Sequence, residues 1–206
     1  DGDIELAVWA QIYSTNVGRA YIFYNDGAYP STAASADVTI AGQSSSYFGN
    51  ALVAGDLDAS GTTDLVIAAF LGDTSVSNAG KIFIFHNDGS IPTTAATADV
   101  TITGDTFVSL ALGSALVVGD FNADGKVDLG AGADNNGAYG SSSYVYIFYN
   151  DGSYPATVST ADVSISSENS SNDGFGNALA AGDFNADGKV DGVDFTIWLT
   201  NYGKRV

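Results

Sequence analysis

An internal repeat of 62 to 64 residues is the feature that most limits what this chain can fold into. Three landmarks recur in the same order and at nearly the same spacing. They are FGNALVAGD, LGSALVVGD and FGNALAAGD at Phe48, Leu112 and Phe175; Asn-Asp-Gly at Asn25, Asn87 and Asn150; and ADVTI, ADVTI and ADVSI at Ala36, Ala98 and Ala161. Self-similarity at a fixed period predicts an array of similar units that bury their apolar faces against one another.

Each unit is predicted to contain four short strands. In the second unit these are Asn50–Ala54, Asp64–Ala69, Lys81–His86 and Asp99–Thr103. The third and fourth are rich in β-branched and aromatic residues, and the fourth alternates apolar with polar positions, as a half-buried strand does. Asn-Asp-Gly and the following proline end the third strand. Four strands in a unit of this length are typical of a propeller blade, so an all-β fold is expected.

The connection between the first and second strands is acidic and has a fixed pattern. GDFNADGKVD occupies Gly119–Asp128 and returns unchanged at Gly182–Asp191, and a looser copy, GDLDASGTTD, occupies Gly55–Asp64. Oxygen-bearing side chains stand at positions one, three, five and nine, glycine stands at position six, and position seven contributes its backbone carbonyl. Alternating side chains of such a tight turn converge on one point, which is the geometry that a hard cation needs.

We therefore predict calcium sites in these loops, with magnesium less favoured because it demands stricter octahedral geometry. The alternative is that the clusters of Asp, Asn and Gly are turns without metal. A fragment of a further copy opens the chain, and whether Asp1 and Glu5 bind metal there stays open. The candidate ligands are Asp56, Asp58, Ser60, Thr62 and Asp64; Asp120, Asn122, Asp124, Lys126 and Asp128; and Asp183, Asn185, Asp187, Lys189 and Asp191, with Asp194 at position twelve of the last loop.

These residues also resemble a known family. The motif FG-(N/S)-AL-xx-GD, followed by the aspartate loop and DLVIAAF, is similar to the FG-GAP repeat of integrin α-subunit propellers and bacterial surface proteins. The resemblance implies blades of four antiparallel strands, with calcium in the hairpin between the first and second strands; the number of repeats predicts about three blades per chain. The chain departs from the family at Leu112, which replaces the first phenylalanine, and at the degenerate "GAP" segments Ala68–Phe70 and Gly130–Gly132.

The last segment breaks the pattern, because GVDFTIWLTNYGKRV stands where a second strand is expected. Phe195, Trp198, Leu199 and Tyr202 lie at helical spacing. With Asp194 they resemble one half of a dockerin module, an aspartate loop followed by a helix. The alternative is that Phe195–Tyr202 is a strand or a helix that packs on the final blade.

The amino-acid composition limits which partners the chain is expected to bind. The formal net charge is −18, from 24 acidic and six basic residues, so the surface repels nucleic acid and anionic lipid and attracts cations. No apolar run approaches the roughly 20 residues of a membrane-spanning helix, and there is no cysteine. Weak calcium loops fill most readily where calcium is millimolar, so we expect an extracellular or cell-surface protein.

The repeat divides the chain into residues 1–47, which hold the second to fourth strands of a blade; 48–111; 112–174; and 175–206, which hold a first strand and its loop. Three blades are fewer than the four to eight of closed propellers. Since unpaired strand edges template association, we expect a homo-oligomer in which complementary half-blades join head to tail, as a ring or a filament.

A structural or interaction module is preferred over an enzyme. The one histidine, His86, occupies a position filled by Tyr24 and Tyr149 in the sister repeats, which indicates a structural position and not a catalytic base. The alternative function is recognition of a carbohydrate or a protein through the variable connections. These are Ala10–Gly18, Leu71–Gly80 and Asp134–Ser143, near which Tyr13, Tyr139 and Tyr144 are candidates for stacking on sugars; the competing interpretation is that they are solvated turns.

Overall fold

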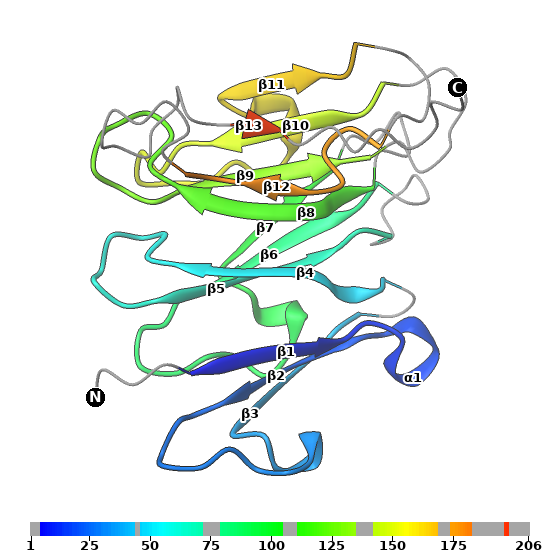
Figure 1. Cartoon of the computed structure of the whole chain (residues 1–206), viewed down its shortest axis with the longest axis vertical. Helices are drawn as coiled ribbons and strands as arrows, with labels where there is room; N and C mark the ends of the chain where they lie inside the picture. Colours follow the sequence, from blue (N-terminus) through cyan, green and yellow to red (C-terminus); the bar gives the residue numbers. More distant parts are fainter. Residues whose placement is uncertain are drawn as a thin grey trace.

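The computed structural model describes residues 5–43, 46–71, 79–104, 111–134, 142–168, 174–182 and 196–197. In these ranges the chain forms three antiparallel sheets of three or four strands, which lie as stacked layers in Figure 1, and one two-stranded sheet. The first sheet has the order β1-β2-β3, with β1 at Leu6–Ala10, β2 at Arg19–Phe23 and β3 at Val38–Ala41. The prediction of an all-β fold is confirmed.

The second and third sheets each have four strands, and neighbours in sequence are neighbours in the sheet. The second contains β4 (Phe48–Gly55), β5 (Asp64–Ala69), β6 (Lys81–Phe85) and β7 (Val100–Thr103). The third contains β8 (Leu112–Gly119), β9 (Asp128–Ala133), β10 (Tyr144–Phe148) and β11 (Val163–Ser166). β12 (Leu179–Ala180) pairs with β13 (Thr196–Ile197) and lies against β8 and β9. The predicted four-stranded antiparallel unit is thus observed twice.

The strand limits follow the sequence pattern closely. Asp64–Ala69 is reproduced, the third strand ends at Phe85 and the fourth begins at Val100, each one residue inside the predicted limit. The first strand is longer than predicted, because β4 begins at Phe48 and contains an irregularity between Phe48 and Leu52.

The middle sheet is buried on both faces, which explains its nearly continuous apolar strands. Along β5, Ile67 belongs to the cluster shared with the first sheet, whereas Val66 belongs to the cluster shared with the third. The fully buried aromatics Phe83 and Phe85 pack toward the first sheet with Phe48. The middle sheet therefore shares a core with each of its two neighbours, as the repeat predicts.

The FG motif is the part of the repeat that joins one sheet to the next. Gly113 has a φ of +91°, and a Cβ there would lie 2.5 Å from Cβ of Ala68 in the preceding sheet. Asn50 Nδ2 donates hydrogen bonds to the carbonyl oxygens of Gly113 and Ser114, at 3.1 and 3.3 Å. Ser114 Oγ in turn donates to the carbonyl of Gly176, at 3.2 Å. Glycine is needed for close approach, and the Asn or Ser after it ties neighbouring layers together.

Four short helical turns were not predicted. α1 (Tyr13–Asn16) has positive φ at Ser14, Thr15 and Asn16, so it is no regular right-handed turn. The other three are 3-10 turns, and each precedes the last strand of its own sheet: η1 (Ala33–Ser35), η2 (Ala95–Thr97) and η3 (Val158–Thr160). Within the described ranges, no helix is long and apolar enough to cross a membrane.

The C-terminal segment is described at two residues. Thr196–Ile197 form strand β13, so at these two residues the structure agrees with the strand alternative and not with a helix. The other residues of that segment lie outside the described ranges.

Candidate metal-binding loops

The loop between β4 and β5 folds around the carboxylate at position one. Asp56 accepts hydrogen bonds from the amides of Ser60 and Gly61, at 3.0 Å to Oδ1 and 2.9 Å to Oδ2. The Ser60 amide also donates to Asp58 Oδ1 at 2.9 Å. Ala59 and Gly61 have φ values of +58° and +87°, which turn the chain sharply. Glycine at position six is therefore required by the backbone conformation.

The loop between β8 and β9 repeats this geometry at the same offsets. Asp120 accepts from the amides of Asp124 and Gly125, at 3.0 and 2.8 Å, and Asn122 Oδ1 accepts from Asp124 at 2.9 Å. Ala123 and Gly125 have φ values of +59° and +87°. Each oxygen of Asp120 accepts one of these bonds, and a carboxylate oxygen has two lone pairs, so capacity for a cation remains.

The aspartate at position nine is buried in both loops and joins the loop to the turn after the third strand. Asp64 accepts from the amides of Leu57 and Asn87, at 2.8 and 2.9 Å. Asp128 accepts from Phe121 and Asn150, at 2.7 and 2.8 Å. The pKa of Asp128 is raised above its ordinary value, chiefly by burial and also by repulsion from Asp124 and Asp120. The hydrogen bonds from the two amides oppose this shift. A carboxylate in this place is costly without a nearby cation.

Position seven makes a contact that the sequence did not predict. Thr62 Oγ1 donates to the carbonyl of Asn87 at 2.8 Å, and Lys126 Nζ donates to the carbonyl of Asn150 at 3.0 Å. The sequence pattern predicts a role only for the backbone carbonyl of this position. The side chain instead ties the loop to the Asn-Asp-Gly turn in both sheets.

His86 lies beside the first loop, a placement that sequence reasoning missed. Its Nδ1 is 3.2 Å from Asp64 Oδ2 and 3.9 Å from Asp58 Oδ2. Among the described residues, these three form the one cluster of at least three acidic, His or Cys side chains whose ligand atoms all lie within 4.8 Å. The strand register could have found it, since Leu65 pairs with Phe85 and Asp64 therefore comes opposite His86. The pKa of Asp58 is lowered, chiefly by a hydrogen bond from the Ser60 side chain and also by the Ser60 amide and by His86.

The aspartate of the ADV landmark also has a role that was not predicted. Asp37, Asp99 and Asp162 each accept a hydrogen bond at 2.8 Å from the amide that follows the third strand, at Tyr24, His86 and Tyr149. In the second and third sheets, two carboxylates therefore accept hydrogen bonds from the turn after the third strand. One is position nine of the loop and the other is the aspartate of the ADV segment.

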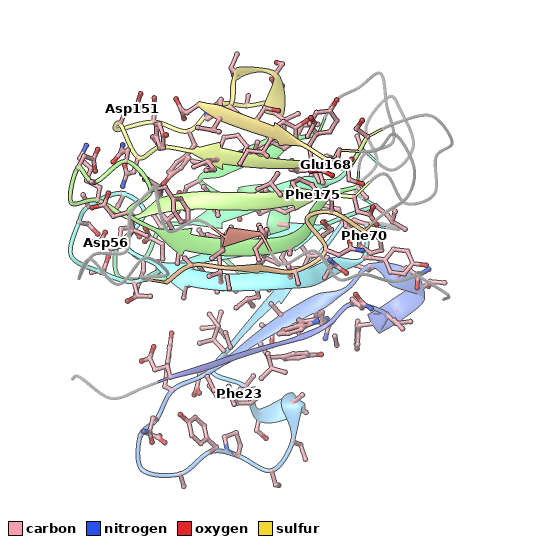
Figure 2. The ribbon with its side chains drawn as sticks, turned by 45° about the horizontal axis from the view of Figure 1, so that its top comes forward. Phe23, Asp56, Phe70, Asp151, Glu168 and Phe175 are labelled. Carbon is pink, nitrogen blue, oxygen red and sulfur yellow. The ribbon has the colours of Figure 1, made fainter. Side chains whose placement is uncertain are left out.

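The loops and the turns that they contact lie at one end of the sheets. Figure 2 shows Asp56 and Asp151 at that end and Phe70 at the other. The third predicted loop, with Asp183, Asn185, Asp187, Lys189, Asp191 and Asp194, lies outside the described residues, as does Asp1.

Two of the tyrosines considered for sugar stacking have their rings engaged. The guanidinium carbon of Arg19 lies 4.0 Å from the centroid of the Tyr13 ring. Tyr144 lies in β10, not in a connection, and stacks on Tyr146 with centroids 5.8 Å apart. Tyr139 lies outside the described residues. Carbohydrate recognition through these rings stays a prediction that no contact described here favours.

A scan against models of known protein families finds no match for this chain. The similarity to the FG-GAP repeat accordingly depends on the motif residues themselves.

Proposed function

We propose that this chain is a calcium-stabilised structural module, in which cations in the acidic loops rigidify stacked β-sheets of the FG-GAP kind. One observation carries the proposal: two loops that differ in sequence adopt the same turn around the carboxylate at position one. Each loop lies in the hairpin between the first and second strands of its sheet, where the resemblance implies calcium.

The loops are coupled to the sheets that carry them. Position nine and position seven both bind the turn after the third strand, so a cation that orders the loop also restrains three strands. Each loop holds three carboxylates, whose mutual repulsion a divalent cation would relieve. Metal binding would in this way contribute to the stability of the fold. Because such loops fill at millimolar calcium, the proposal includes an extracellular setting.

The binding part is tested by calorimetric titration of the metal-free protein with calcium. Asp120→Ala should reduce the calcium bound by about one ion per chain, because it removes the carboxylate around which the loop turns. Asp88→Ala, an exposed aspartate outside the loops, is the charge-matched control and should bind as the parent does. Equal calcium binding by the parent and Asp120→Ala would contradict the proposal.

We also propose head-to-tail self-association through the outer face of the first sheet. Leu6 and Val8 are 46% and 38% exposed there, whereas Leu65 and Ile67, their equivalents in the second sheet, are 5% and 0% exposed. Tyr21 and Phe23 pair with Val8 and Leu6 and share their face, but they are 9% and 8% exposed, so the uncovered part of this face is β1. In the second sheet this face is covered by the preceding sheet, so a sheet of the same kind fits the first sheet, and we propose that a second copy supplies one. Such contacts give a ring if they close and a filament if they do not.

Sedimentation in calcium tests the association. A double variant Leu6→Ser and Val8→Ser should sediment as a smaller species than the parent, since exposed positions tolerate serine but lose apolar contact. Ile12→Ser, which changes a 68% exposed residue outside the strand, is the matched control. A monomeric parent at all concentrations would contradict the association while leaving calcium binding intact.

A further inference from the structure

We propose that Asp58, Asp64 and His86 form a binding site for a divalent transition-metal ion that accepts imidazole, of the Zn²⁺ class, which the third sheet lacks. The three side chains come from different parts of the second sheet: the β4–β5 loop, the start of β5 and the residue after β6. Two carboxylates and one imidazole suit Zn²⁺ and its neighbours in the first transition row better than calcium, which takes oxygen ligands.

The separations fit a small tetrahedral ion. Zinc binds imidazole nitrogen and carboxylate oxygen at about 2.0–2.2 Å, so two ligand atoms on a tetrahedron stand about 3.3–3.6 Å apart. His86 Nδ1 and Asp64 Oδ2 are 3.2 Å apart, which lets an ion replace the proton between them. Asp58 Oδ2 stands 3.9 Å from the same nitrogen, and its side chain is 35% exposed on the loop, so a small shift completes the third contact.

The buried carboxylate anchors the site. The side chain of Asp64 is 0% exposed, and its Oδ2 accepts from the Leu57 amide. A carboxylate oxygen has a second lone pair, which His86 now occupies and a metal ion could take. Asp64 is thus fixed in position before any ion binds, and such preorganisation lowers the cost of binding.

A second, independent observation points to a ligand here. Asp58 and His86 line a cavity of about 290 Å³ between the second and third sheets, together with Asn150 and Tyr154. Asn150 is 2% exposed, and its amide Nδ2 has no hydrogen-bond partner. Buried amide donors nearly always have an acceptor. An oxygen ligand that completes the coordination of the ion from the cavity would provide one.

The third sheet provides an internal comparison. Leu129 pairs with Phe148, so Asp128 comes opposite Tyr149, which takes the place of His86. A phenol is a poor ligand for zinc at neutral pH, and burial together with Asp128 and Asp162 raises the pKa of Tyr149 further. The two sheets therefore share the loop but differ in the one residue that an imidazole-accepting ion requires.

The test uses the metal-free protein without a histidine affinity tag, titrated with Zn²⁺ and with Co²⁺. Because His86 is the one histidine among 206 residues, its imidazole resonances report this site alone. We expect them to shift on addition of Zn²⁺, and Co²⁺ to develop the visible absorption of a four-coordinate site. His86→Tyr, which installs the residue of the sister repeat, should keep the fold by circular dichroism and weaken Zn²⁺ binding at least about tenfold.

Reciprocal and control experiments separate the possible outcomes. Asp58→Asn should weaken Zn²⁺ binding as well, whereas Asp120→Ala in the other loop should leave it unchanged. Equal Zn²⁺ affinity in the parent and in a folded His86→Tyr variant would overturn the proposal, as would imidazole resonances that do not respond to Zn²⁺. Asp58 and Asp64 are candidate ligands for either ion, so the Zn²⁺ titration is carried out without calcium; Zn²⁺ binding without calcium binding would refute the proposed function and leave this site standing.

Discussion

The two described acidic loops share a backbone but differ in their chemistry. Both turn around an aspartate at position one and are held by a buried aspartate at position nine. The Asp56–Asp64 loop has hydroxyls at positions five and seven and faces His86. The Asp120–Asp128 loop has a carboxylate and an ammonium at those positions and comes opposite Tyr149. Positions one, six and nine thus maintain the turn, whereas positions five, seven and the residue opposite nine are free to tune its charge.

The largest expected effect concerns what the loops share. Asp64→Ala and Asp128→Ala each remove a buried carboxylate that accepts two amide hydrogen bonds, and they leave those amides unsatisfied. We expect each variant to lower the free energy of unfolding by about 3 kcal/mol. Urea unfolding in the presence of chelator measures it, with Asp88→Ala as the control. A large loss of stability in one variant and none in the other would show that position nine does not have the same role in the two loops.

Position seven should separate the loops. Lys126→Ala removes a charged donor to the Asn150 carbonyl, together with a positive charge in an acidic loop, and should cost about 2 kcal/mol without metal. Thr62→Ala removes a neutral donor to the Asn87 carbonyl and should cost about 1 kcal/mol. The same unfolding assay compares them, and Lys126→Met separates the charge from the packing of the stem. Equal costs would show that the ammonium contributes no more than the hydroxyl.

Lowering the pH should change the contributions of Asp128 and Asp58 to folding stability in opposite directions. This is the smallest of the expected effects. The pKa of Asp128 is raised, so the folded chain binds the proton more tightly than the unfolded chain. The contribution of this group therefore favours folding at acidic pH and is lost as the pH rises through its raised pKa. The pKa of Asp58 is lowered, so its contribution is present above the ordinary value and is lost as the pH falls through the lowered pKa.

Unfolding of the metal-free protein between pH 7 and pH 3, with Asp128→Asn and Asp58→Asn beside the parent, measures both contributions. The two variants should change the slope of stability against pH with opposite signs. Changes of the same sign would contradict the assignment.

Much of the fold could be predicted from the sequence because the strands carry it locally. Asp64–Ala69 has a continuous apolar pattern between a loop and a turn, and its limits were predicted without error. α1 could not be predicted, since Ser14, Thr15 and Asn16 adopt positive φ without glycine. The inter-sheet bonds of Asn50 depend on how layers stack, which a pattern within one unit does not specify.

The candidate site was predictable in part. The offsets of aspartate, asparagine and glycine predicted the turns at Asp56 and Asp120, because those turns are made by residues close in sequence. The sequence indicates only a structural position for His86, since its contact with Asp64 joins two strands and 22 residues separate the partners. The side chains at position seven were missed for the same reason, as Lys126 reaches a turn in another connection.

The melting temperature as a function of calcium concentration tests the central claim most directly. If the loops bind calcium in the folded state and not in the unfolded chain, the melting temperature at neutral pH should rise steadily with calcium, and chelator should lower it steeply. At calcium 100-fold above the dissociation constant, one site adds about 2.7 kcal/mol. Asp56→Ala combined with Asp120→Ala should weaken that dependence. A melting curve that neither calcium nor chelator moves would contradict the account.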